Sequence, residues 1–297
     1  MAKLGFLGLG IMGYPMAQHL IGSDHEVALW SHTRSKAEEL AATGNAKACA
    51  TPREVAENAE YIFCCVGDSA MSREVALGPD GLIQGIQKGA VVADCSTIAP
   101  DVSVAIGEEF AAKGAFFLDA PCTGSTGGAR GGTLTFMIGG DQAAFERAKP
   151  YFELMGKLFY YCGGPGMGLN AKLTQNLVLS NIMAAFNEGI VLSTKAGLSP
   201  ELVLDILNNS AAKSGLIAFK APYIFARNFE TNFSTKWMHK DIGMALDSGK
   251  RLGVPLPITG LTHQMFQAAI SKGLADDDFC STIKVLEDLA GVEVKKS

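Results

Sequence analysis

The sequence predicts an α/β domain built on a doubly wound parallel sheet, followed by an all-helical domain. In the first half, short and continuously apolar runs alternate with helix-period segments, a pattern typical of parallel strands covered by helices on both faces. After about Gly163 the strand pattern stops and long helical stretches follow. The glycine- and proline-rich segment 163–166 marks the change. We therefore expect domains at residues 1–163 and 164–297.

The expected elements follow from the spacing of the apolar residues. Strands are expected at Lys3–Gly8, Glu26–Ser31, Tyr61–Val66, Ala90–Ser96, Ala115–Ala120, Leu134–Ile138 and Leu158–Cys162. Helices are expected first at Met12–Ile21, Lys36–Ala42, Arg53–Asn58, Pro100–Lys113 and Gln142–Met155, then at Leu169–Ala196, Pro200–Ser210, Trp237–Leu252, Thr259–Lys272 and Phe279–Ala290. The helix 169–196 is apolar on almost every side, so we expect it in the core of the domain or between two copies of the chain.

Composition narrows the class of protein. The 297 residues carry 25 Lys and Arg against 30 Asp and Glu, a net charge of −5, so no positive field would gather nucleic acid or an anionic membrane. With 48% hydrophobic and 19% charged residues, the chain is expected to fold. It has no run of about 18 uninterrupted apolar residues, and its apolar start lacks a cationic lead-in. The seven cysteines show no zinc-like spacing. We expect a soluble cytoplasmic protein with free thiols and no metal.

A glycine-rich turn follows the first strand directly and opens the first helix. Gly8 allows a tight turn, Gly10 lets the backbone approach a pyrophosphate, and Gly13 lets helix and strand pack closely. The start of the helix adds N–H groups and the positive end of its dipole for the anion. The spacing therefore predicts dinucleotide binding by Gly8, Gly10, Ile11, Met12 and Gly13.

The residues after the second strand bear on the choice between NAD and NADP. A carboxylate here would bind a ribose 2′-hydroxyl and repel a 2′-phosphate. The segment 31–34 contains no acidic residue, and its guanidinium and hydroxyl groups suit a phosphate. The cofactor-binding candidates are therefore Ser31, His32, Thr33 and Arg34, with NADP favoured and NAD as the alternative.

Further candidates follow other strands at their carboxyl ends, where doubly wound sheets bind ligands. Ser96 is the last residue of the fourth expected strand, and Thr97 follows it. Val66 is the last residue of the third, and we include it among the cofactor-binding candidates. After the fifth strand, Thr123-Gly124-Ser125 begins a stretch rich in Gly, Ser and Thr. Its hydroxyls and open N–H groups suit a small carboxylate, although the same composition is also typical of a flexible surface loop.

Lys172 and Asn176 are four residues apart near the start of the long helix, so both side chains project from one face. The lysine stands at the junction of two domains on an otherwise apolar helix. A surface lysine that reaches back to solvent fits such a position poorly. This pattern favours a functional role for the pair.

The chain resembles the β-hydroxyacid dehydrogenase family, relatives of 6-phosphogluconate dehydrogenase, over nearly its whole length. The family includes 3-hydroxyisobutyrate dehydrogenase, tartronate semialdehyde reductase and glyoxylate/succinic semialdehyde reductases. Four ordered motifs carry the resemblance, namely Gly8 to Ala17, Asp119-Ala120-Pro121 followed by Gly131-Gly132-Thr133-Leu134, Gly168 with Lys172 and Asn176, and Lys240-Asp241. The resemblance implies a Rossmann-type first domain, a helical second domain and a homodimer or homotetramer formed through the helices.

The resemblance also implies a role for each matched residue. Lys172 would be the general acid/base, and Asn176 would orient it or the substrate. Ser96 and Thr97 would lie near the nicotinamide and the substrate carboxylate, and Lys240 would touch the cofactor from the helical domain. The other implied substrate contacts are Thr123, Gly124, Ser125, Phe233 and Asp241.

Two departures from the family pattern bear on specificity. The usual Ser-Gly-Gly reads Thr123-Gly124-Ser125 here, so an added methyl group and an added side chain should narrow the pocket. The Asn-Arg-Thr of many NADP users reads Ser31-His32-Thr33, with the arginine displaced to Arg34, which keeps NAD open as the cofactor.

The implied reaction is hydride transfer from the nicotinamide to a carbonyl carbon. The oxygen becomes an alkoxide, which the Lys172 ammonium can stabilise and protonate without a metal. We expect an NAD(P)-dependent reductase of a short aldehyde or keto acid, with glyoxylate and succinic semialdehyde favoured. The alternatives are 3-hydroxyisobutyrate, tartronate semialdehyde and sulfolactaldehyde, since one methylene group is worth only about 1–3 kcal/mol in a pocket.

Three more distant interpretations are disfavoured by the sequence. A 6-phosphogluconate dehydrogenase proper would have a longer helical part and a phosphate clamp in the substrate loop. Imine reductases share the architecture but typically lack the lysine found here at 172. A catalytically silent scaffold with the same fold is the non-enzyme alternative, and the presence of Lys172, Asn176 and Lys240 argues against it.

Overall fold

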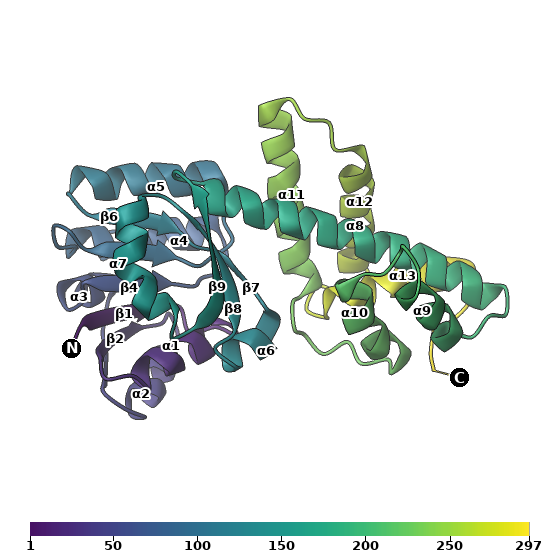
Figure 1. Ribbon diagram of the computed structural model, residues 1–297, viewed down its shortest axis with the longest axis horizontal. Coiled ribbons are helices and arrows are strands. Elements are labelled where there is room, and N and C mark those ends of the chain that lie inside the picture. Colours follow the sequence, from purple (N-terminus) through teal and green to yellow (C-terminus); the bar gives the residue numbers. More distant parts are fainter. Residues whose placement is uncertain (297) are drawn as a thin grey trace. The chain divides into compact units, whose positions relative to one another are not determined.

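The computed structural model describes residues 1–296 and contains the two parts that the sequence predicts, an α/β unit and a helical unit (Figure 1). The first compact unit ends at Lys172 and the second begins at Leu173. The expected boundary at residues 163–164 precedes this point. The reason is that the long helix α8 (Met167–Lys195) begins in the first unit and continues into the second.

The first unit alternates strands and helices. Its strands are β1 (Lys3–Leu7), β2 (Glu26–Trp30), β3 (Ala46–Ala48), β4 (Tyr61–Cys64), β5 (Val91–Asp94), β6 (Phe116–Asp119), β7 (Cys122–Thr123), β8 (Leu134–Gly139) and β9 (Gly156–Gly163). Its other helices are α1 (Gly13–Ile21), α2 (Arg34–Ala41), α3 (Pro52–Glu57), α4 (Ser69–Leu77), the 3₁₀ helix η1 (Leu82–Gln84), α5 (Pro100–Ala112), α6 (Ser125–Arg130) and α7 (Gln142–Phe152).

The strands form one sheet in the order β3-β2-β1-β4-β5-β6-β8-β7, and β9 pairs with β8. β1 pairs in parallel with β2 on one side and with β4 on the other, so the chain builds the sheet outward in both directions. The doubly wound prediction is therefore confirmed. β8 pairs antiparallel with β6 and β7, which ends the otherwise parallel order on that side. Ligands of such sheets bind at the carboxyl ends of the strands where the order reverses, here β1 and β4.

Both faces of this sheet are buried. Val91 and Ala93 of β5 pack in a cluster with residues of α1, α2 and α7, whereas Val92 between them packs with residues of α3, α4 and α5. Adjacent strand residues point to opposite faces, and here both faces meet helices. This two-sided burial is the reason that the strands are continuously apolar in sequence.

The helical unit contains most of α8 together with α9 (Pro200–Asn208), α10 (Gly215–Phe225), α11 (Thr235–Leu252), α12 (Pro257–Ser271), the 3₁₀ helix η2 (Phe279–Thr282) and α13 (Ile283–Ala290). Met183, Phe186 and Ile190 of α8 belong to its core, with residues of α10, α11 and α12. Within residues 1–296, α8 is the one helix long and apolar enough to cross a membrane by length and composition. Its buried Asn187 donates a hydrogen bond of 3.0 Å to Thr282, as expected of a core helix.

Several short elements differ from the sequence-based expectation. β3, β7, α4, α6 and α10 were not predicted, and the expected loop after β6 contains β7 and α6. Strands of two or three residues are too short to show an apolar period, and α10 contains Pro222 in its interior. The helix expected at 279–290 begins with the 3₁₀ turn η2.

Candidate active site

The predicted cofactor turn lies between β1 and α1. Gly8 has a φ of +92°, and a Cβ atom there would collide with the Cys65 carbonyl oxygen. A Cβ atom on Gly13 would collide with the carbonyl oxygen of Gly8. At Gly10, by contrast, a Cβ atom would meet nothing within 4 Å. Packing within the chain therefore requires Gly8 and Gly13, whereas the bare backbone at Gly10 leaves space that a pyrophosphate can use.

The start of α1 is also suited to an anion. Ile11 is exposed, and Met12 is the N-cap residue, with no side chain that caps the helix. The first N–H groups of a helix have no partner within the helix, and the helix dipole favours negative charge at this end. The turn and the helix start together fit the pyrophosphate of a dinucleotide.

The polar segment after β2 lies at the surface. Arg34 is the first residue of α2, and its Nε donates to Glu38 at 2.7 Å. Thr33 is the N-cap residue of α2 and makes no side-chain capping hydrogen bond. His32 is exposed and Ser31 is half-buried. The end of β2 thus displays a guanidinium group and hydroxyls, with one carboxylate already bound to the guanidinium.

A buried chain of hydrogen bonds joins the ends of β4 and β5. The Ser96 amide donates to the Asp94 carboxylate at 2.9 Å, and the Val66 amide donates to the Ser96 hydroxyl at 2.8 Å. Asp94 and Ser96 are both buried, and Thr97 is half-buried beside them. Val66, Ser96 and Thr97 therefore lie together at the carboxyl edge of the sheet. Asp94, which we did not predict, fixes the backbone at Ser96. An acidic residue at the end of a buried strand is the feature that could have identified it.

Asp119 ends β6 and caps the start of α8. Its carboxylate accepts the backbone N–H groups of Gly166 at 2.7 Å and Leu169 at 2.8 Å. Burial raises the pKa of Asp119 to about 6, although these hydrogen bonds oppose the rise. The sequence motif contains Asp119, but its capping role could not be predicted. The contact fixes the part of α8 that carries Lys172.

Lys172 is buried, with 8% of its surface exposed. Burial raises the pKa of Cys122 to about 11, and the positive charge of Lys172 opposes that rise. Cys122 belongs to β7 and directly precedes Thr123. The ammonium group therefore acts electrostatically on the strand that begins the predicted carboxylate loop. A buried ammonium is costly, so its presence in an apolar helix indicates a use for its charge or its proton.

The predicted carboxylate loop is more regular than expected. Thr123 lies in β7, opposite Thr135 of β8, and Ser125 is the first residue of α6. Gly124 has a φ of +135° and Ser125 a φ of +55°, both in a region that side chains disfavour. The backbone thus turns sharply between two hydroxyl-bearing residues, with glycine where the turn demands it.

In the helical unit, three predicted residues form one cluster. The Asn176 Nδ2 donates to an Asp241 carboxylate oxygen at 2.6 Å, and each side chain is only 2% exposed. The Lys240 Nζ lies 3.2 Å from the other Asp241 oxygen and 5.4 Å from the centre of the Trp237 ring. Because the amide nitrogen binds Asp241, the amide oxygen of Asn176 is the atom left to accept a hydrogen from a hydroxyl or an ammonium.

The predicted residues thus fall into two sets. Those in the first unit are Gly8, Gly10, Ile11, Met12, Gly13, Ser31, His32, Thr33, Arg34, Val66, Ser96, Thr97, Thr123, Gly124, Ser125 and Lys172. Those in the helical unit are Asn176, Phe233, Lys240 and Asp241. Phe233 precedes α11 and its ring lies edge-on to Phe279, with 6.2 Å between ring centres. Lys172 and Asn176 are about one helical turn apart in α8, which runs through both units.

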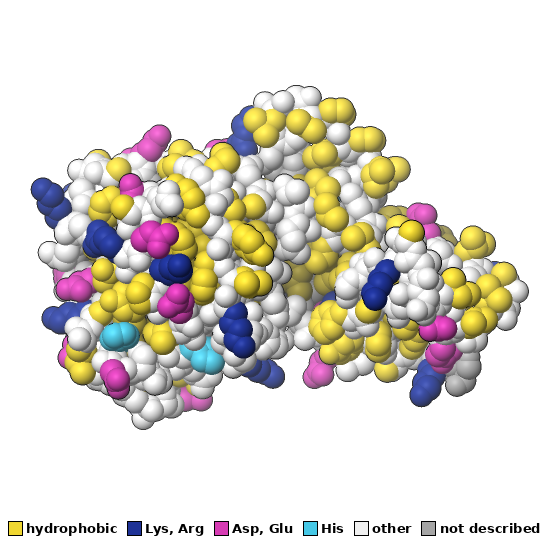
Figure 2. Space-filling view, in the orientation of Figure 1, with side chains coloured by type: hydrophobic (Ala, Val, Ile, Leu, Met, Phe, Trp, Pro, Cys, Tyr) yellow, Lys and Arg dark blue, Asp and Glu magenta, His cyan; other side chains and the backbone are white. Residues whose placement is uncertain are grey.

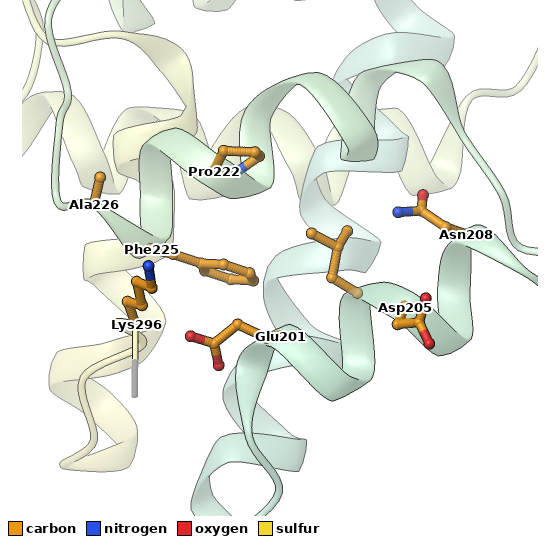
Figure 3. A pocket seen from close by; sticks show the side chains of 8 residues that line it. Glu201, Asp205, Asn208, Pro222, Phe225, Ala226 and Lys296 are labelled. Atoms are coloured by element: carbon orange, nitrogen blue, oxygen red, sulfur yellow. The ribbon is translucent and has the colours of Figure 1, made fainter.

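A pocket of about 470 Å³ lies elsewhere in the helical unit, between α9 and α10 (Figure 3). Its lining residues are Glu201, Leu204, Asp205, Asn208, Pro222, Phe225, Ala226 and Lys296. None of them is a predicted site residue. The carboxylates of Glu201 and Asp205 would repel the carboxylate of an acid substrate, so this pocket is a poor candidate for the active site.

Six of the seven cysteines lie in the first unit, and Cys280 lies in the helical unit. All seven cysteines are free thiols, as expected. Burial raises the pKa of Cys64 and Cys95 well above the usual value, so these thiols stay protonated and unreactive. Among residues 1–296, no group of three or more His, Cys, Asp or Glu side chains is arranged to hold a metal ion.

Comparisons with known proteins agree with this geometry. Residues 3–164 match the NAD binding domain of 6-phosphogluconate dehydrogenase, and residues 166–286 match the domain described as NAD-binding of NADP-dependent 3-hydroxyisobutyrate dehydrogenase. Glyoxylate/succinic semialdehyde reductase 2, a chloroplastic protein of Arabidopsis thaliana, is 36% identical over 285 residues, which are 96% of this chain and 79% of the relative.

Two solved structures share the whole fold. The 3-hydroxyisobutyrate dehydrogenase of Mycobacterium tuberculosis, solved with L-serine, has a TM-score of 0.89 and 29% identity, and the match covers 96% of this chain and 99% of that one. Psf3 in complex with NADP+ and 2-OPP has a TM-score of 0.85 and 26% identity, with 95% and 99% covered.

The first unit contains a glycine turn after β1, polar groups at the carboxyl ends of β4 and β5, and a buried lysine that acts on Cys122 of β7. This arrangement is the one expected of a nicotinamide-dependent dehydrogenase. Matches along almost the entire length of both units narrow this class. The chain belongs to the β-hydroxyacid dehydrogenase family. It is an oxidoreductase that acts on CH–OH groups with a nicotinamide cofactor.

Proposed function

We propose that this enzyme reduces a short aldehyde or keto acid to the hydroxy acid with NADPH, and that Lys172 is its general acid. The observation that carries the proposal is the buried Lys172, whose charge acts on Cys122 at the start of the carboxylate loop. Glyoxylate and succinic semialdehyde are the favoured substrates, and the name of the Arabidopsis relative supports this choice. The alternatives are 3-hydroxyisobutyrate, tartronate semialdehyde and sulfolactaldehyde.

Lys172, Asn176 and Asp241 would each have a separate role in the proposed reaction. When bound, the cofactor supplies a hydride to the carbonyl carbon of the substrate. Lys172 stabilises the negative charge that develops on the carbonyl oxygen and donates a proton to it, and in the reverse direction its neutral amine accepts that proton. Asn176, held through its amide nitrogen by Asp241, would direct its oxygen to the Lys172 ammonium group or to the hydroxyl group of the hydroxy acid.

The substrate carboxylate would be bound by the turn after β7. Thr123 and Ser125 supply hydroxyls and Gly124 supplies an unobstructed backbone, with Ser96 contributing a further hydroxyl from the end of β5. The methyl group of Thr123 and the side chain of Ser125 take up room that the family pattern leaves open, which favours small acids. Phe233 would cover the apolar side of the substrate.

NADP is the proposed cofactor because of the groups after β2. Arg34 and Thr33 would bind the 2′-phosphate through charge-assisted hydrogen bonds. The Arg34–Glu38 pair is exposed, and solvent and salt weaken such surface pairs, so a phosphate can replace the carboxylate. The complex of Psf3 with NADP+ supports this choice.

A homodimer or homotetramer formed through the helical unit is part of the proposal. Leu192 of α8 and Leu289 of α13 are 72% and 79% exposed, and Ile206 of α9 is 54% exposed. Figure 2 shows hydrophobic side chains gathered at the surface of this unit. Apolar surface of this kind is typical of protein interfaces. We also propose that the enzyme is located in the cytoplasm.

A rate assay with a panel of substrates tests the function. The fall in nicotinamide absorbance is followed with NADPH and with NADH against glyoxylate, succinic semialdehyde, tartronate semialdehyde, sulfolactaldehyde and methylmalonate semialdehyde, the oxidised partner of 3-hydroxyisobutyrate. The proposal predicts the highest kcat/KM for glyoxylate or succinic semialdehyde with NADPH. Turnover confined to another member of the panel would replace the substrate but keep the reaction class, whereas cofactor binding with no turnover would contradict the proposal.

A further inference from the structure

Asp278 is a buried carboxylate outside the predicted site, and it holds the segment 229–234 that leads into α11. Its Oδ2 accepts the backbone N–H groups of Asn232 at 3.0 Å and of Phe233 at 3.2 Å. Its Oδ1 accepts the N–H group of Cys280 at 3.1 Å. One carboxylate thus supplies the acceptors for two adjacent amides, one of which belongs to the proposed substrate residue Phe233.

Backbone hydrogen bonds attach the same segment to the residues around Asp278. The Phe279 amide donates to the Phe233 carbonyl oxygen at 3.0 Å. The amide of Thr235, the first residue of α11, donates to the Asp277 carbonyl oxygen at 2.9 Å. The position of Phe233 and the start of α11 are therefore both determined by the backbone at 277–279.

The charge of Asp278 is balanced by Lys220 on α10. The Lys220 Nζ donates to both carboxylate oxygens, at 2.8 and 2.7 Å, and neither side chain is more than 2% exposed. The centres of the Phe219 and Phe279 rings each lie 4.9 Å from the Lys220 Nζ. A buried ion pair adds little stability compared with apolar residues of the same volume, so its presence favours a role in fixing geometry.

The geometry points to Lys220 and Asp278 as positioning residues for substrate binding. The pair fixes the backbone at Phe233 and with it the start of α11, the helix that carries Lys240 and Asp241. Neither side chain of the pair acts on the substrate. The assignment of Phe233 as a substrate contact rests on the proposed function. Loss of the pair frees this segment and weakens binding of the aldehyde acid, while the cofactor turn in the α/β unit keeps its structure.

Lys220→Met is the first test, because it removes the cation that holds both oxygens of the Asp278 carboxylate in place and keeps a side chain of similar length. Glu287→Gln is the matched control. Glu287 is 5% exposed and accepts from Arg227 at 2.6 Å, so it also belongs to an ion pair of the helical unit, but the amides of Asn232 and Phe233 donate to Asp278 and not to this pair. Amide hydrogen exchange at Asn232 and Phe233, the KM values and the melting temperature are measured for wild type and for both variants.

The inference predicts that Lys220→Met speeds exchange at the two amides and raises KM for glyoxylate by about tenfold or more. KM for NADPH should rise less because, of the predicted cofactor residues, only Lys240 lies in α11. Glu287→Gln should lower the melting temperature but leave exchange at these amides and both KM values near wild type. Unchanged exchange in Lys220→Met, or equal KM changes in both variants, would overturn the inference. Asp278→Asn provides a second variant with the same expectations if Lys220→Met does not fold.

The exchange measurement separates this inference from the proposed function. If wild type turns over no short aldehyde acid, the proposed substrate class fails, yet faster exchange at Asn232 and Phe233 in Lys220→Met still supports the positioning role. If wild type is active and exchange does not change, the inference fails and the proposed function stands.

Discussion

The amide nitrogen of Asn176 lies 2.6 Å from a carboxylate oxygen of Asp241, and both side chains are almost wholly buried. A contact so short and so well shielded orients the Asn176 amide group. The Asn176 side chain shares one face of α8 with Lys172, which lies about one turn earlier. In the proposed proton transfer, Asp241 therefore has a second role beside its implied contact with the substrate. It holds the Asn176 amide group in place.

Asp241→Asn should lower kcat by roughly tenfold or more, because a hydrogen bond to a charged group is worth about 1.5–3 kcal/mol and the Asn176 amide loses its fixed orientation. Steady-state kinetics measure the effect. Thr259→Val is the control, since it removes the acceptor for Asn181 of the same helix, a hydrogen bond of 3.1 Å, away from the site. Equal losses of kcat in the two variants would mean that the Asn176–Asp241 contact only stabilises the fold.

Gly10→Ala and Gly13→Ala add the same methyl group but should have different effects on protein stability and on NADPH binding. At Gly10 the methyl group enters open space, so the variant should melt near the wild-type temperature but bind NADPH more weakly. At Gly13 it collides with the Gly8 carbonyl oxygen, so the variant should be destabilised by about 1–3 kcal/mol. Melting curves and fluorescence titration with NADPH separate the two effects. Wild-type NADPH affinity in Gly10→Ala would exclude this turn as the pyrophosphate site.

Arg34→Ala should raise KM for NADPH by about tenfold and leave KM for NADH unchanged, because only NADPH carries the 2′-phosphate. Glu38→Gln should lower KM for NADPH, since it removes the carboxylate that pairs with Arg34. Arg53→Ala is the matched control, as Arg53 forms the same kind of exposed pair with Glu57 at 2.8 Å. An equal change for NADH and NADPH would remove Arg34 as the phosphate-binding residue.

Asp119 predicts a pH dependence of stability. Its pKa of about 6 in the folded protein lies above the ordinary value of 3.8, so the folded state binds the proton more tightly than the unfolded state. This carboxyl group therefore favours folding below about pH 4 and loses up to about 2–3 kcal/mol of that contribution as the pH rises through 6. Asp119→Asn should lack this slope.

Denaturant unfolding of wild type and Asp119→Asn between pH 4 and 7 measures the difference. The stability of wild type relative to the variant should fall as the pH rises. Asp141→Asn serves as the control, because Asp141 also caps a helix, accepting from Ala144 at 2.7 Å, but is exposed. Parallel curves for wild type and Asp119→Asn would contradict the assignment.

Much of the fold could be predicted because both faces of the sheet are buried. The strands β1, β2 and β5 begin and end within one or two residues of the expected bounds, since two-sided burial makes their sequences continuously apolar. The two-residue strand β7 and the glycine-rich helix α6 carry no such period. The strand β7 forms by pairing with β8, which the local sequence does not encode.

The candidate site, like the fold, has parts that the sequence predicts and parts that it does not. The turn from Gly8 to Gly13 and the Lys172–Asn176 pair could be predicted, because their members are close in sequence and their spacing has a direct geometric meaning. The capping role of Asp119 could not, because Gly166 lies 47 residues further along the chain. Lys220 and Asp278 are 58 residues apart, and neither residue belongs to a recognisable motif.

Proton donation by Lys172 is tested by the turnover of Lys172→Ala with NADPH and glyoxylate, beside Lys195→Ala at the other end of α8. If Lys172 is the general acid, Lys172→Ala loses at least about 100-fold in kcat, the contribution typical of such a group, while its dissociation constant for NADPH stays within about twofold of wild type. Lys195→Ala should match wild type in both quantities. Substantial turnover in Lys172→Ala, or loss of NADPH binding in the folded variant, would contradict the assignment of Lys172 as the proton donor.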